Sequence, residues 1–324
     1  MDRLSQIKSP INTDLEQFKE LFHTSLDNSN PLLKEVLSHI KQRKGKMMRP
    51  ILVLLIARLL GKVTSSTLHA AVSLELLHTA SLVHDDVVDE SSERRGQASV
   101  NAIYNNKVSI LVGDYLLATC LYQAAFSNNN EIIKVVSQLG QDLSEGELLQ
   151  LSNVSNTEIS ESVYFDVIRK KTAALFAACT QTAALSADAT PEQLEMARLF
   201  GEYTGICFQI KDDIFDYFDD REVGKPTGND MREGKLTLPA IHAINHSDDF
   251  SVKEMAVKIK AGTATVEEIT GMINYTKKNM GIEYATQVMM DYHSKAISLL
   301  ADFPDSEIKR SLVDYLDYVV DRKK

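Results

Sequence analysis

Apolar residues recur at three- and four-residue intervals along nearly the whole chain, and long runs of alternating β-branched residues are missing. Glycine and proline, which interrupt helices, number only 14 and 7 among 324 residues. The pattern predicts an all-α protein with roughly ten or more helices joined by short loops. Neither a linker nor a low-complexity tract nor a repeat of fixed period divides the chain. We therefore expect residues 1–324 to form a single domain.

Capping residues predict where some of these helices begin and end. Pro50 stands near the start of an apolar helix that runs from Ile51 to Leu60, and Gly61 ends it. Thr190 followed by Pro191 predicts another helix start, with threonine as the N-cap and proline in the first turn.

A further helix and a long polar loop are also predicted. The helix is expected to present one apolar face, formed by Leu116, Leu117, Cys120, Leu121 and Ala124. The loop runs from Asp219 to Lys235 and contains three glycines and a proline. Loops of this length inside compact helical proteins are usually functional, so we expect it to act on the site.

Composition and charge narrow the possible partners. With 44% hydrophobic residues the chain can bury a substantial core, yet no stretch of about eighteen uncharged apolar residues predicts an integral membrane segment. The charged N-terminus does not resemble a signal peptide, and three scattered cysteines are typical of reduced thiols. A net charge of −10 argues against nucleic acid as a partner. We expect a cytoplasmic protein, peripheral to membranes if it contacts them.

The most informative segment is an acidic cluster at positions 82 to 90, Leu-Val-His-Asp-Asp-Val-Val-Asp-Glu. Asp85 and Asp89 are four residues apart and share one helix face, with Asp86 beside them. Like charges in this arrangement repel, and apolar neighbours argue against a merely solvated acidic face. Carboxylates are the ligands that magnesium uses when it bridges a protein to phosphates, so the cluster is a candidate metal site.

A second cluster repeats this pattern at positions 209 to 216, Gln-Ile-Lys-Asp-Asp-Ile-Phe-Asp. Here Asp212 and Asp216 form the same-face pair and Asp213 lies beside them. Two such clusters can face each other across a cavity and hold magnesium ions that take the charge of a diphosphate. The repetition makes the metal interpretation stronger than either cluster does alone.

Basic residues stand close to both acidic clusters in this net-acidic chain. Lys46 and Arg49 are about one turn apart at a predicted helix start, which favours anion binding, although a solvated basic turn has the same pattern. The others can bind diphosphate oxygens as forks or point charges; they are Arg94, Arg95, Lys171, Lys225 and Lys235.

Taken together, these residues resemble the all-trans polyprenyl diphosphate synthases, and most closely the bacterial medium- and long-chain members of octaprenyl type. The resemblance extends from Gly-Lys-x-x-Arg-Pro at 45 to 50, through both Asp-Asp-x-x-Asp motifs and Glu145-Gly146-Glu147, to the basic C-terminus. It implies a bundle of antiparallel helices around a central cavity, the isoprenoid synthase fold. It also implies a homodimer that binds isopentenyl diphosphate, an allylic diphosphate and about three magnesium ions per site.

The resemblance assigns roles to individual residues. Asp85 and Asp89 would bind magnesium with the allylic diphosphate, supported by Asp86, and the second cluster would supply further metal-site residues, Asp212, Asp213 and Asp216. The allylic diphosphate would contact Arg94, Lys171, Thr172, Gln209, Lys225 and Lys235. Isopentenyl diphosphate would be held by Lys46, Arg49, His78 and Arg95. The tail Arg322-Lys323-Lys324 resembles one that closes over this substrate, but basic residues are also favoured at any helix C-terminus.

The chemistry expected from the resemblance is ionisation, condensation and elimination. Charge on the leaving diphosphate would be stabilised by metal and basic side chains, and the released diphosphate would take the final proton. Thr172 and Gln209 would present oxygen dipoles to the allylic cation. The loop from Asp219 to Lys235 is the candidate lid that excludes water.

Product length is expected to depend on the helix that carries the first cluster. Ser81, Leu77 and Leu74 fall on nearly the same face as Asp85, so the growing chain should pass along them. Ala80 and Ser81 are small, which leaves no shallow stop, and the helix from Leu116 to Phe126 is expected to help form a deeper floor. These positions predict a product longer than about fifteen carbons.

Three other functions share part of the pattern. A metal-dependent phosphohydrolase would use His84 and Asp85 with His69 or His78, but it leaves the second cluster unexplained. A terpene cyclase shares the ionisation chemistry, yet the chain has no tryptophan and the Lys46 and Arg49 pair would be idle. A non-catalytic or partner-dependent subunit of a heteromeric synthase is the remaining alternative, although both acidic clusters are intact here.

Overall fold

The structure of the chain, a computed structural model, describes residues 2–42, 45–94, 96–154, 159–218 and 227–322. Within these ranges the regular elements are helices, apart from one antiparallel hairpin that pairs β1 (Glu93–Arg94) with β2 (Gln97–Ala98). The prediction of an all-α protein is therefore confirmed. Arg95, Lys225 and the tail residues Lys323 and Lys324 lie outside the described residues.

The chain divides into two compact units, which are described separately. The first comprises residues 1–141, 175–201 and 302–315, and the second comprises residues 142–174, 202–301 and 316–324. Some long helices contribute residues to both units; they are α8 (Asn130–Val154), α11 (Pro191–Phe215) and α17 (Glu307–Asp321). The single domain expected from the sequence stays a prediction.

The remaining helices fall almost entirely within one unit. Those of the first are α1 (Arg3–Lys8), a 3₁₀ turn (Ser9–Ile11), α2 (Asn12–Ser25), α3 (Pro31–Lys41), α4 (Met48–Leu60), α5 (Ser65–Val88), α6 (Val100–Ile103), α7 (Asn106–Phe126) and α10 (Ala174–Ser186). Those of the second are α9 (Glu161–Ile168), a π-helical turn (Arg169–Ala173), α12 (Asn229–Arg232), α13 (Leu238–Asn245), α14 (Phe250–Lys260), α15 (Val266–Lys278) and α16 (Gly281–Ser298).

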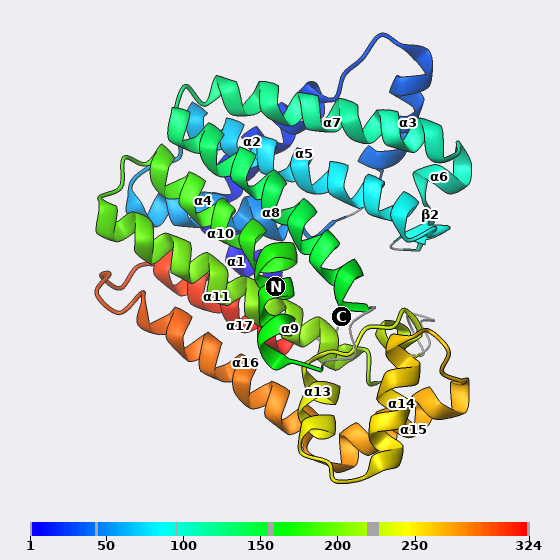
Figure 1. Cartoon of the computed structure of the whole chain (residues 1–324). Coiled ribbons are helices and arrows are strands. Elements are labelled where there is room, and N and C mark those ends of the chain that lie inside the picture. The colour runs from blue at the N-terminus through cyan, green and yellow to red at the C-terminus, as the bar shows by residue number, and fades with distance from the viewer. Residues whose placement is uncertain (1, 43–44, 95, 155–158, 219–226, 323–324) are drawn as a thin grey trace. The chain divides into compact units, whose positions relative to one another are not determined.

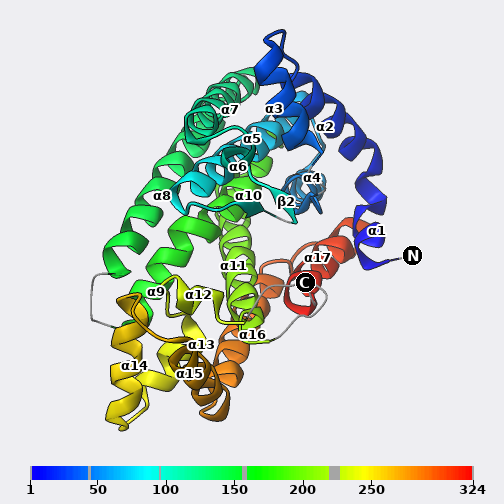
Figure 2. The same ribbon diagram turned by 90° about the vertical axis from the view of Figure 1, so that its right-hand side faces the viewer.

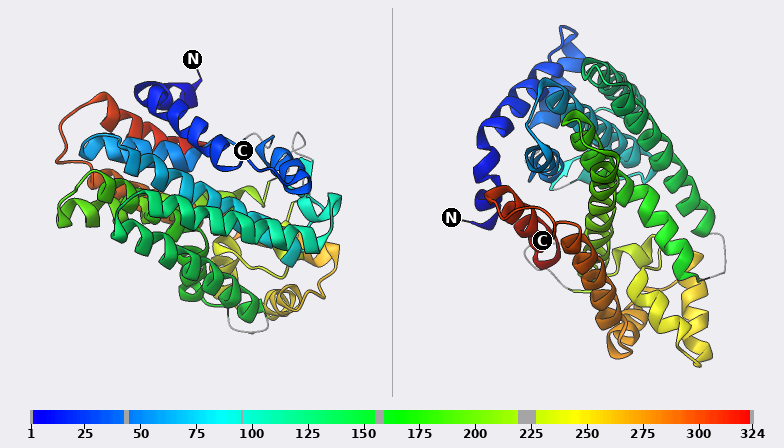
Figure 3. Two further views of the ribbon diagram at one scale, coloured as in Figure 1. Left: turned by 90° about the horizontal axis from the view of Figure 1, so that it is seen from above. Right: turned by 90° about the vertical axis from the view of Figure 1, so that its left-hand side faces the viewer.

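The core of the first unit forms around α5, against which α2, α4 and α7 pack (Figures 1 and 3). Residues 50–57 of α4 are all buried, as expected for a helix that is apolar on every side. In the second unit, α13, α14 and α15 surround an apolar cluster that includes Ile244, Ile259 and Met272 (Figure 2). The three cysteines, Cys120, Cys179 and Cys207, are buried free thiols, as the sequence predicted.

Helices α5 and α7 run antiparallel and in close contact. His69, near the start of α5, lies 2.8 Å from the side-chain oxygen of Gln123, near the end of α7. At the other end of α5, the ring of His84 occupies the space that a side chain at Gly113 would need. Glycine at 113 therefore allows the two helices to approach each other beside the first acidic cluster.

The apolar residues of α7 lie on two faces, contrary to the single face expected from the sequence. Leu116, Cys120 and Ala124 are buried, whereas Leu121 is 55% exposed. The exposed stripe, called the α7 stripe below, consists of Ile110, Leu111, Leu121, Tyr122 and Phe126. By length and composition α7 is the one helix among the described residues apolar enough to cross a membrane, and one such helix is weak support for a span.

The predicted helix ends are confirmed. Helix α4 begins two residues before Pro50 and has Gly61 as its C-cap. Helix α11 begins at Pro191, and the Thr190 hydroxyl accepts the backbone N–H of Gln193 at 3.3 Å. The predicted polar loop is not wholly irregular, because the short helix α12 forms within it.

Gly201 marks a close approach of α11 to α10 within the first unit. A Cβ atom there would lie 2.5 Å from the backbone oxygen of Phe176 and 2.7 Å from the Cα of Ala177. Backbone atoms in the middle of a helix cannot move away as a flexible side chain does. Gly140 of α8, by contrast, has open space at the Cβ position.

We predict that Gly201→Ala lowers the free energy of unfolding by about 1–3 kcal/mol, because the two helices must separate. Gly140→Ala is the matched control and should stabilise the protein by about 0.5–1 kcal/mol, because alanine favours the helix. Urea denaturation followed by circular dichroism measures both. Equal stability of Gly201→Ala and the wild type would contradict the close contact of α10 and α11.

Candidate active site

The first acidic cluster lies at the C-terminal end of α5, in the first unit. Asp89 is the C-cap, and its backbone N–H donates to the backbone oxygen of Asp85 at 2.8 Å. Asp85 is partly buried and Asp89 is exposed, whereas Asp86 is fully buried. Two carboxylates of the cluster are thus accessible, and the third points into the protein.

Polar contacts fix the end of α5 around the buried Asp86. Its carboxylate pairs with the guanidinium of Arg94, the residue expected to contact the allylic diphosphate. The side-chain amide of Asn101 donates to the backbone oxygens of Asp86 and Ser91 at 3.0 and 3.1 Å. The hydroxyl of Ser99 also donates to Ser91 at 2.7 Å. These contacts hold the segment that carries Asp89, and no acidic or basic motif pointed to Asn101.

His84 points away from the acidic cluster and toward α7. Its Nε2 lies 3.3 Å from the backbone oxygen of Ile110 and 3.4 Å from a carboxylate oxygen of Asp114. His69 is engaged with Gln123 near the opposite end of α5. Among the described residues no group of three or more His, Cys, Asp and Glu side chains could hold a metal ion by itself. This arrangement disfavours a phosphohydrolase built on His84 and Asp85.

The residues expected to hold isopentenyl diphosphate are spread along α4 and α5 in the first unit. Lys46 is exposed two residues before α4, and Arg49 lies in the first turn of that helix. The Arg49 guanidinium lies 6.0 Å from the ring centroid of Phe176. His78 is buried within α5, with 9% of its surface exposed. Their binding role stays a prediction.

The positions expected to control product length are mostly buried in α5. Leu74 and Ala80 are fully buried and Leu77 is 5% exposed. Ser81 is partly buried, and its hydroxyl donates to the backbone oxygen of His78 at 2.9 Å. That bond satisfies the hydroxyl within the helix, so Ser81 behaves as a small side chain, and its role in chain length stays a prediction.

The second acidic cluster lies at the C-terminal end of α11, in the second unit. The side chain of Asp212 is 43% exposed, and one of its oxygens lies 2.7 Å from a guanidinium nitrogen of Arg322. The same nitrogen donates to the backbone oxygen of Phe208 at 2.8 Å. The described residue of the basic tail therefore contacts the predicted metal ligand Asp212.

Asp216 caps the short helix α12. Its two carboxylate oxygens accept the backbone N–H groups of Asn229 and Asp230 at 2.9 and 3.1 Å. Its backbone oxygen accepts the N–H of Gly228 at 2.9 Å. Asp216 thus ties the end of the predicted lid to α11, and its assignment as a metal ligand stays a prediction that these contacts do not favour.

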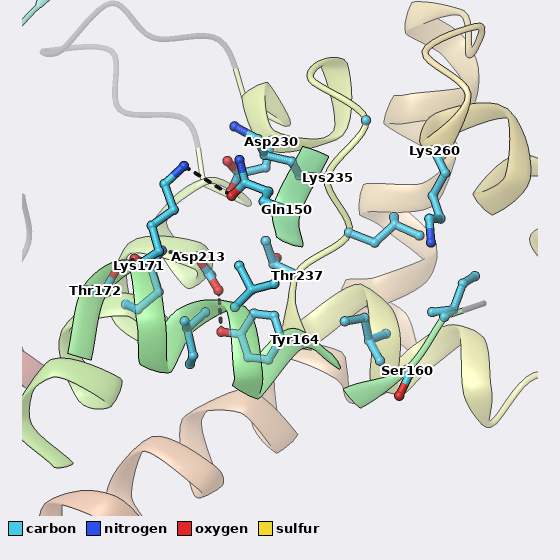
Figure 4. Close-up of a pocket in the computed structure, with 17 residues that line it drawn as sticks. Gln150, Ser160, Tyr164, Lys171, Thr172, Asp213, Asp230, Lys235, Thr237 and Lys260 are labelled. Carbon is cyan, nitrogen blue, oxygen red and sulfur yellow. Dashed lines mark hydrogen bonds between the residues drawn. The ribbon is translucent and has the colours of Figure 1, made fainter. Parts of the chain in front are cut away.

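A cavity of about 230 Å³ in the second unit brings several predicted residues together (Figure 4). Lys171, Thr172, Gln209 and Asp213 line it with Lys235, and its remaining wall mixes apolar side chains such as Ile159 and Leu236 with polar ones such as Gln150 and Lys260. A cavity of mixed character can accept a molecule with a charged head and a hydrocarbon part.

Two of the three described lysines that line the cavity are held by carboxylates. Lys171 pairs with Glu147 and lies 3.3 Å from the side-chain oxygen of Gln150. Lys235 pairs with Glu233 at 2.6 Å. Lys171 and Thr172 belong to the π-helical turn, a distortion that often occurs at functional sites.

Asp213 lies within a chain of hydrogen bonds. One of its oxygens accepts the Tyr164 hydroxyl at 2.5 Å, and the other accepts the side-chain amide of Gln209 at 2.8 Å. The oxygen of that amide accepts the Thr172 hydroxyl at 2.6 Å. Asp213 is 2% exposed, so its assignment as a metal ligand also stays a prediction that burial does not favour.

Burial raises the pKa of several carboxyls around this cavity. The pKa of Asp213 lies well above its ordinary value, first because of burial and then because of the charge of Asp230. Burial likewise raises the pKa of Asp230 to about 7. An approaching cation would favour the ionised form of both.

Several cavity residues were not predicted from the sequence, among them Asp230 and Tyr164. Asp230 is one of several acidic residues in the predicted loop, so nothing in the sequence singled it out. Tyr164 gave no signal, because a tyrosine in an apolar helix is usually part of the core.

Known proteins resemble the chain over nearly its full length. A family model described as polyprenyl synthetase matches residues 30–276. Octaprenyl diphosphate synthase of Haemophilus influenzae is 34% identical over 323 residues, 99% of this chain and 97% of that protein.

Solved structures agree in fold. The geranylgeranyl pyrophosphate synthase from Bacteroides thetaiotaomicron is 60% identical with a TM-score of 0.88, over 99% of this chain and 100% of that one. The polyprenyl synthase from Caulobacter crescentus CB15, complexed with calcium and isoprenyl diphosphate, is 30% identical with a TM-score of 0.92. The match covers 99% of this chain and 98% of that one. The predicted isoprenoid synthase fold and prenyl-transfer activity are thereby confirmed. The chain belongs to the polyprenyl synthetase family.

Proposed function

We propose that this chain condenses isopentenyl diphosphate with an allylic diphosphate and releases a medium- or long-chain all-trans polyprenyl diphosphate. The cavity of the second unit is the observation that carries the proposal. It combines lysine, threonine and glutamine side chains with apolar ones such as Ile159, Val167 and Leu236. A diphosphate attached to a hydrocarbon needs both kinds of surface.

Magnesium is the metal that we propose for the reaction, with about three ions per site. Asp85, Asp89 and Asp212 fit such a role, because each has carboxylate surface open to solvent. Magnesium is commonly held by one or two carboxylates, with water and substrate phosphates completing its shell. When bound, it neutralises charge on the departing diphosphate. The buried Asp86 and the capping Asp216 would then act on structure.

The basic residues would bind the two diphosphates. We assign Arg94, Lys171 and Lys235 to the allylic substrate, with Lys225, which lies outside the described residues. Lys171 and Lys235 would exchange their glutamate partners for diphosphate oxygens, a replacement that keeps each ammonium group paired. We assign isopentenyl diphosphate to Lys46, Arg49, His78 and, beyond the described residues, Arg95.

The side chains near the first acidic cluster favour a long product. Ala80 and Ser81 place no bulky ring near the first cluster, which favours elongation past farnesyl diphosphate. The two named relatives point to different lengths, geranylgeranyl and octaprenyl. We propose a medium- or long-chain product, longer than geranylgeranyl diphosphate, made in the cytoplasm by an enzyme at most peripherally bound to a membrane.

We further propose that the enzyme is a homodimer that uses the α7 stripe. Leu111, Leu121 and Tyr122 are 61%, 55% and 64% exposed on one side of α7. A large apolar stripe is unfavourable in water, and a two-fold axis would bury two copies of it at once.

The activity can be tested with purified chain, magnesium, isopentenyl diphosphate and, separately, dimethylallyl, geranyl and farnesyl diphosphate. We expect mass spectrometry to show a ladder ending at one dominant product longer than farnesyl diphosphate. Removal of magnesium with a chelator should abolish the ladder, because diphosphate charge would be uncompensated. Absence of condensation with every primer would contradict a stand-alone enzyme. Activity restored by a second protein would then support the partner-dependent subunit.

The metal assignment predicts that substituting a solvent-accessible aspartate changes the magnesium dependence, whereas substituting an aspartate that caps a helix changes stability. Asp89→Asn should raise the magnesium concentration that gives half-maximal rate by about tenfold or more, because it removes a charged ligand. Asp216→Ala should leave that concentration nearly unchanged while lowering stability by about 0.5–2 kcal/mol, because α12 loses its cap. Magnesium titrations of the initial rate and urea denaturation measure the two effects. Equal magnesium shifts in both variants would contradict the assignment.

The dimer proposal predicts that Leu121→Lys shifts the protein toward monomers, because the substitution places a charge at both copies of the interface. Leu148→Lys is the control, since Leu148 is 66% exposed on α8, outside the stripe. Analytical ultracentrifugation over a range of protein concentrations measures the mass. An unchanged mass for Leu121→Lys would rule out this surface.

A further inference from the structure

The hydrogen bonds around Asp213 form a chain with a fixed direction. Thr172 donates to the oxygen of the Gln209 amide, and the nitrogen of that amide donates to Asp213. Tyr164 donates to the other oxygen of Asp213. All four side chains line the same cavity, and Figure 4 shows Tyr164, Asp213 and Thr172 along one wall of it.

The direction follows from what each group can donate. A carboxylate, the form of Asp213 that an approaching cation favours, accepts hydrogen bonds, and the nitrogen of an amide only donates them. Asp213 therefore orients the Gln209 amide with its nitrogen inward and its oxygen toward Thr172. The threonine hydroxyl has one proton, which this oxygen takes up. The lone pairs of the Thr172 oxygen are then left for the cavity.

Reversal of the amide would reverse the hydroxyl. With nitrogen and oxygen of Gln209 exchanged, the amide would donate to Thr172, and the threonine proton would turn toward the cavity. The two arrangements nearly match in shape, so packing alone does not choose between them. The choice depends on the acceptor at Asp213.

Tyr164 completes the anchor. It is 7% exposed, and its hydroxyl donates to Asp213. Its bond to Asp213 occupies the oxygen that Gln209 does not use. The carboxylate is thus held from both sides and cannot rotate away from the amide.

We propose that Tyr164 and Asp213 are positioning residues that fix the direction of the Thr172 hydroxyl, so that its oxygen faces the allylic cation. The inference rests on the proposed function, since it concerns the charge that develops there. An oriented dipole in a cavity sheltered from water stabilises such charge without reorganising during the reaction. A proton facing the cation would oppose it.

The test compares Tyr164→Phe, Asp213→Asn and Thr172→Val with Tyr275→Phe as the matched control. Tyr275 also donates its hydroxyl, to Ser247 at 2.7 Å in the same unit, but it does not line the cavity. Rates would be measured with magnesium, isopentenyl diphosphate and a primer that the wild type accepts. Thermal denaturation of each variant verifies that it is folded.

We expect Tyr164→Phe to lower kcat about tenfold, and Asp213→Asn to lower it about a hundredfold, because an asparagine can donate to the reversed amide. KM for both substrates and the magnesium dependence should stay unchanged, as should the kcat of Tyr275→Phe. In the Thr172→Val background, Tyr164→Phe should have no further effect, because the hydroxyl that it orients is gone.

Three results would overturn the inference. A wild-type kcat for Tyr164→Phe would show that the anchor is not needed. A full further loss in the Thr172→Val background would show that Tyr164 does not act through Thr172. A shift in magnesium dependence for Asp213→Asn would make Asp213 a metal ligand instead. Absence of condensation by the wild type would instead refute the proposed function, a separate outcome.

Discussion

Repulsion between neighbouring carboxylates limits how the two acidic clusters can be built. Each cluster places three aspartates within five residues at the end of a helix, where the helix dipole also disfavours negative charge. The protein accommodates them by giving some of the carboxylates hydrogen-bond or ion-pair partners and leaving the others exposed to solvent. Asp86 pairs with Arg94, Asp216 caps α12, and Asp213 accepts two donors. The accessible charges that remain are those that we propose for metal binding.

Hydrogen bonds at both acidic clusters also fix the chain segments beside them. Asn101 holds the end of α5 in the first unit, and Asp216 holds the start of α12 in the second. Each short connection is therefore fastened to the helix that carries a cluster. Rigid attachment of this kind keeps a reactive side chain within the small tolerance that catalysis requires.

Much of the fold and part of the site follow from the sequence. The helical periodicity of apolar residues and the capping residues predict α4 and the start of α11, because both signals depend only on neighbouring residues in the sequence. Helical spacing also predicts that Asp85 and Asp89 share an accessible face. Spacing could not separate Asp212 from Asp213 and Asp216, because their partners, Tyr164 and the N–H groups of α12, come from distant segments. Spacing also could not predict that Leu121 is exposed, because α7 has apolar residues on both its buried side and its exposed side.

The three buried cysteines give the protein a set of internal reporters. Burial raises the pKa of Cys120, Cys179 and Cys207 to about 12, so their thiols hardly react while they are covered. Alkylation at neutral pH would occur only when the surrounding helices open. Cys120 and Cys179 belong to the first unit and Cys207 to the second. Peptide mapping of labelled cysteines could therefore time the opening of each unit separately, without adding a probe.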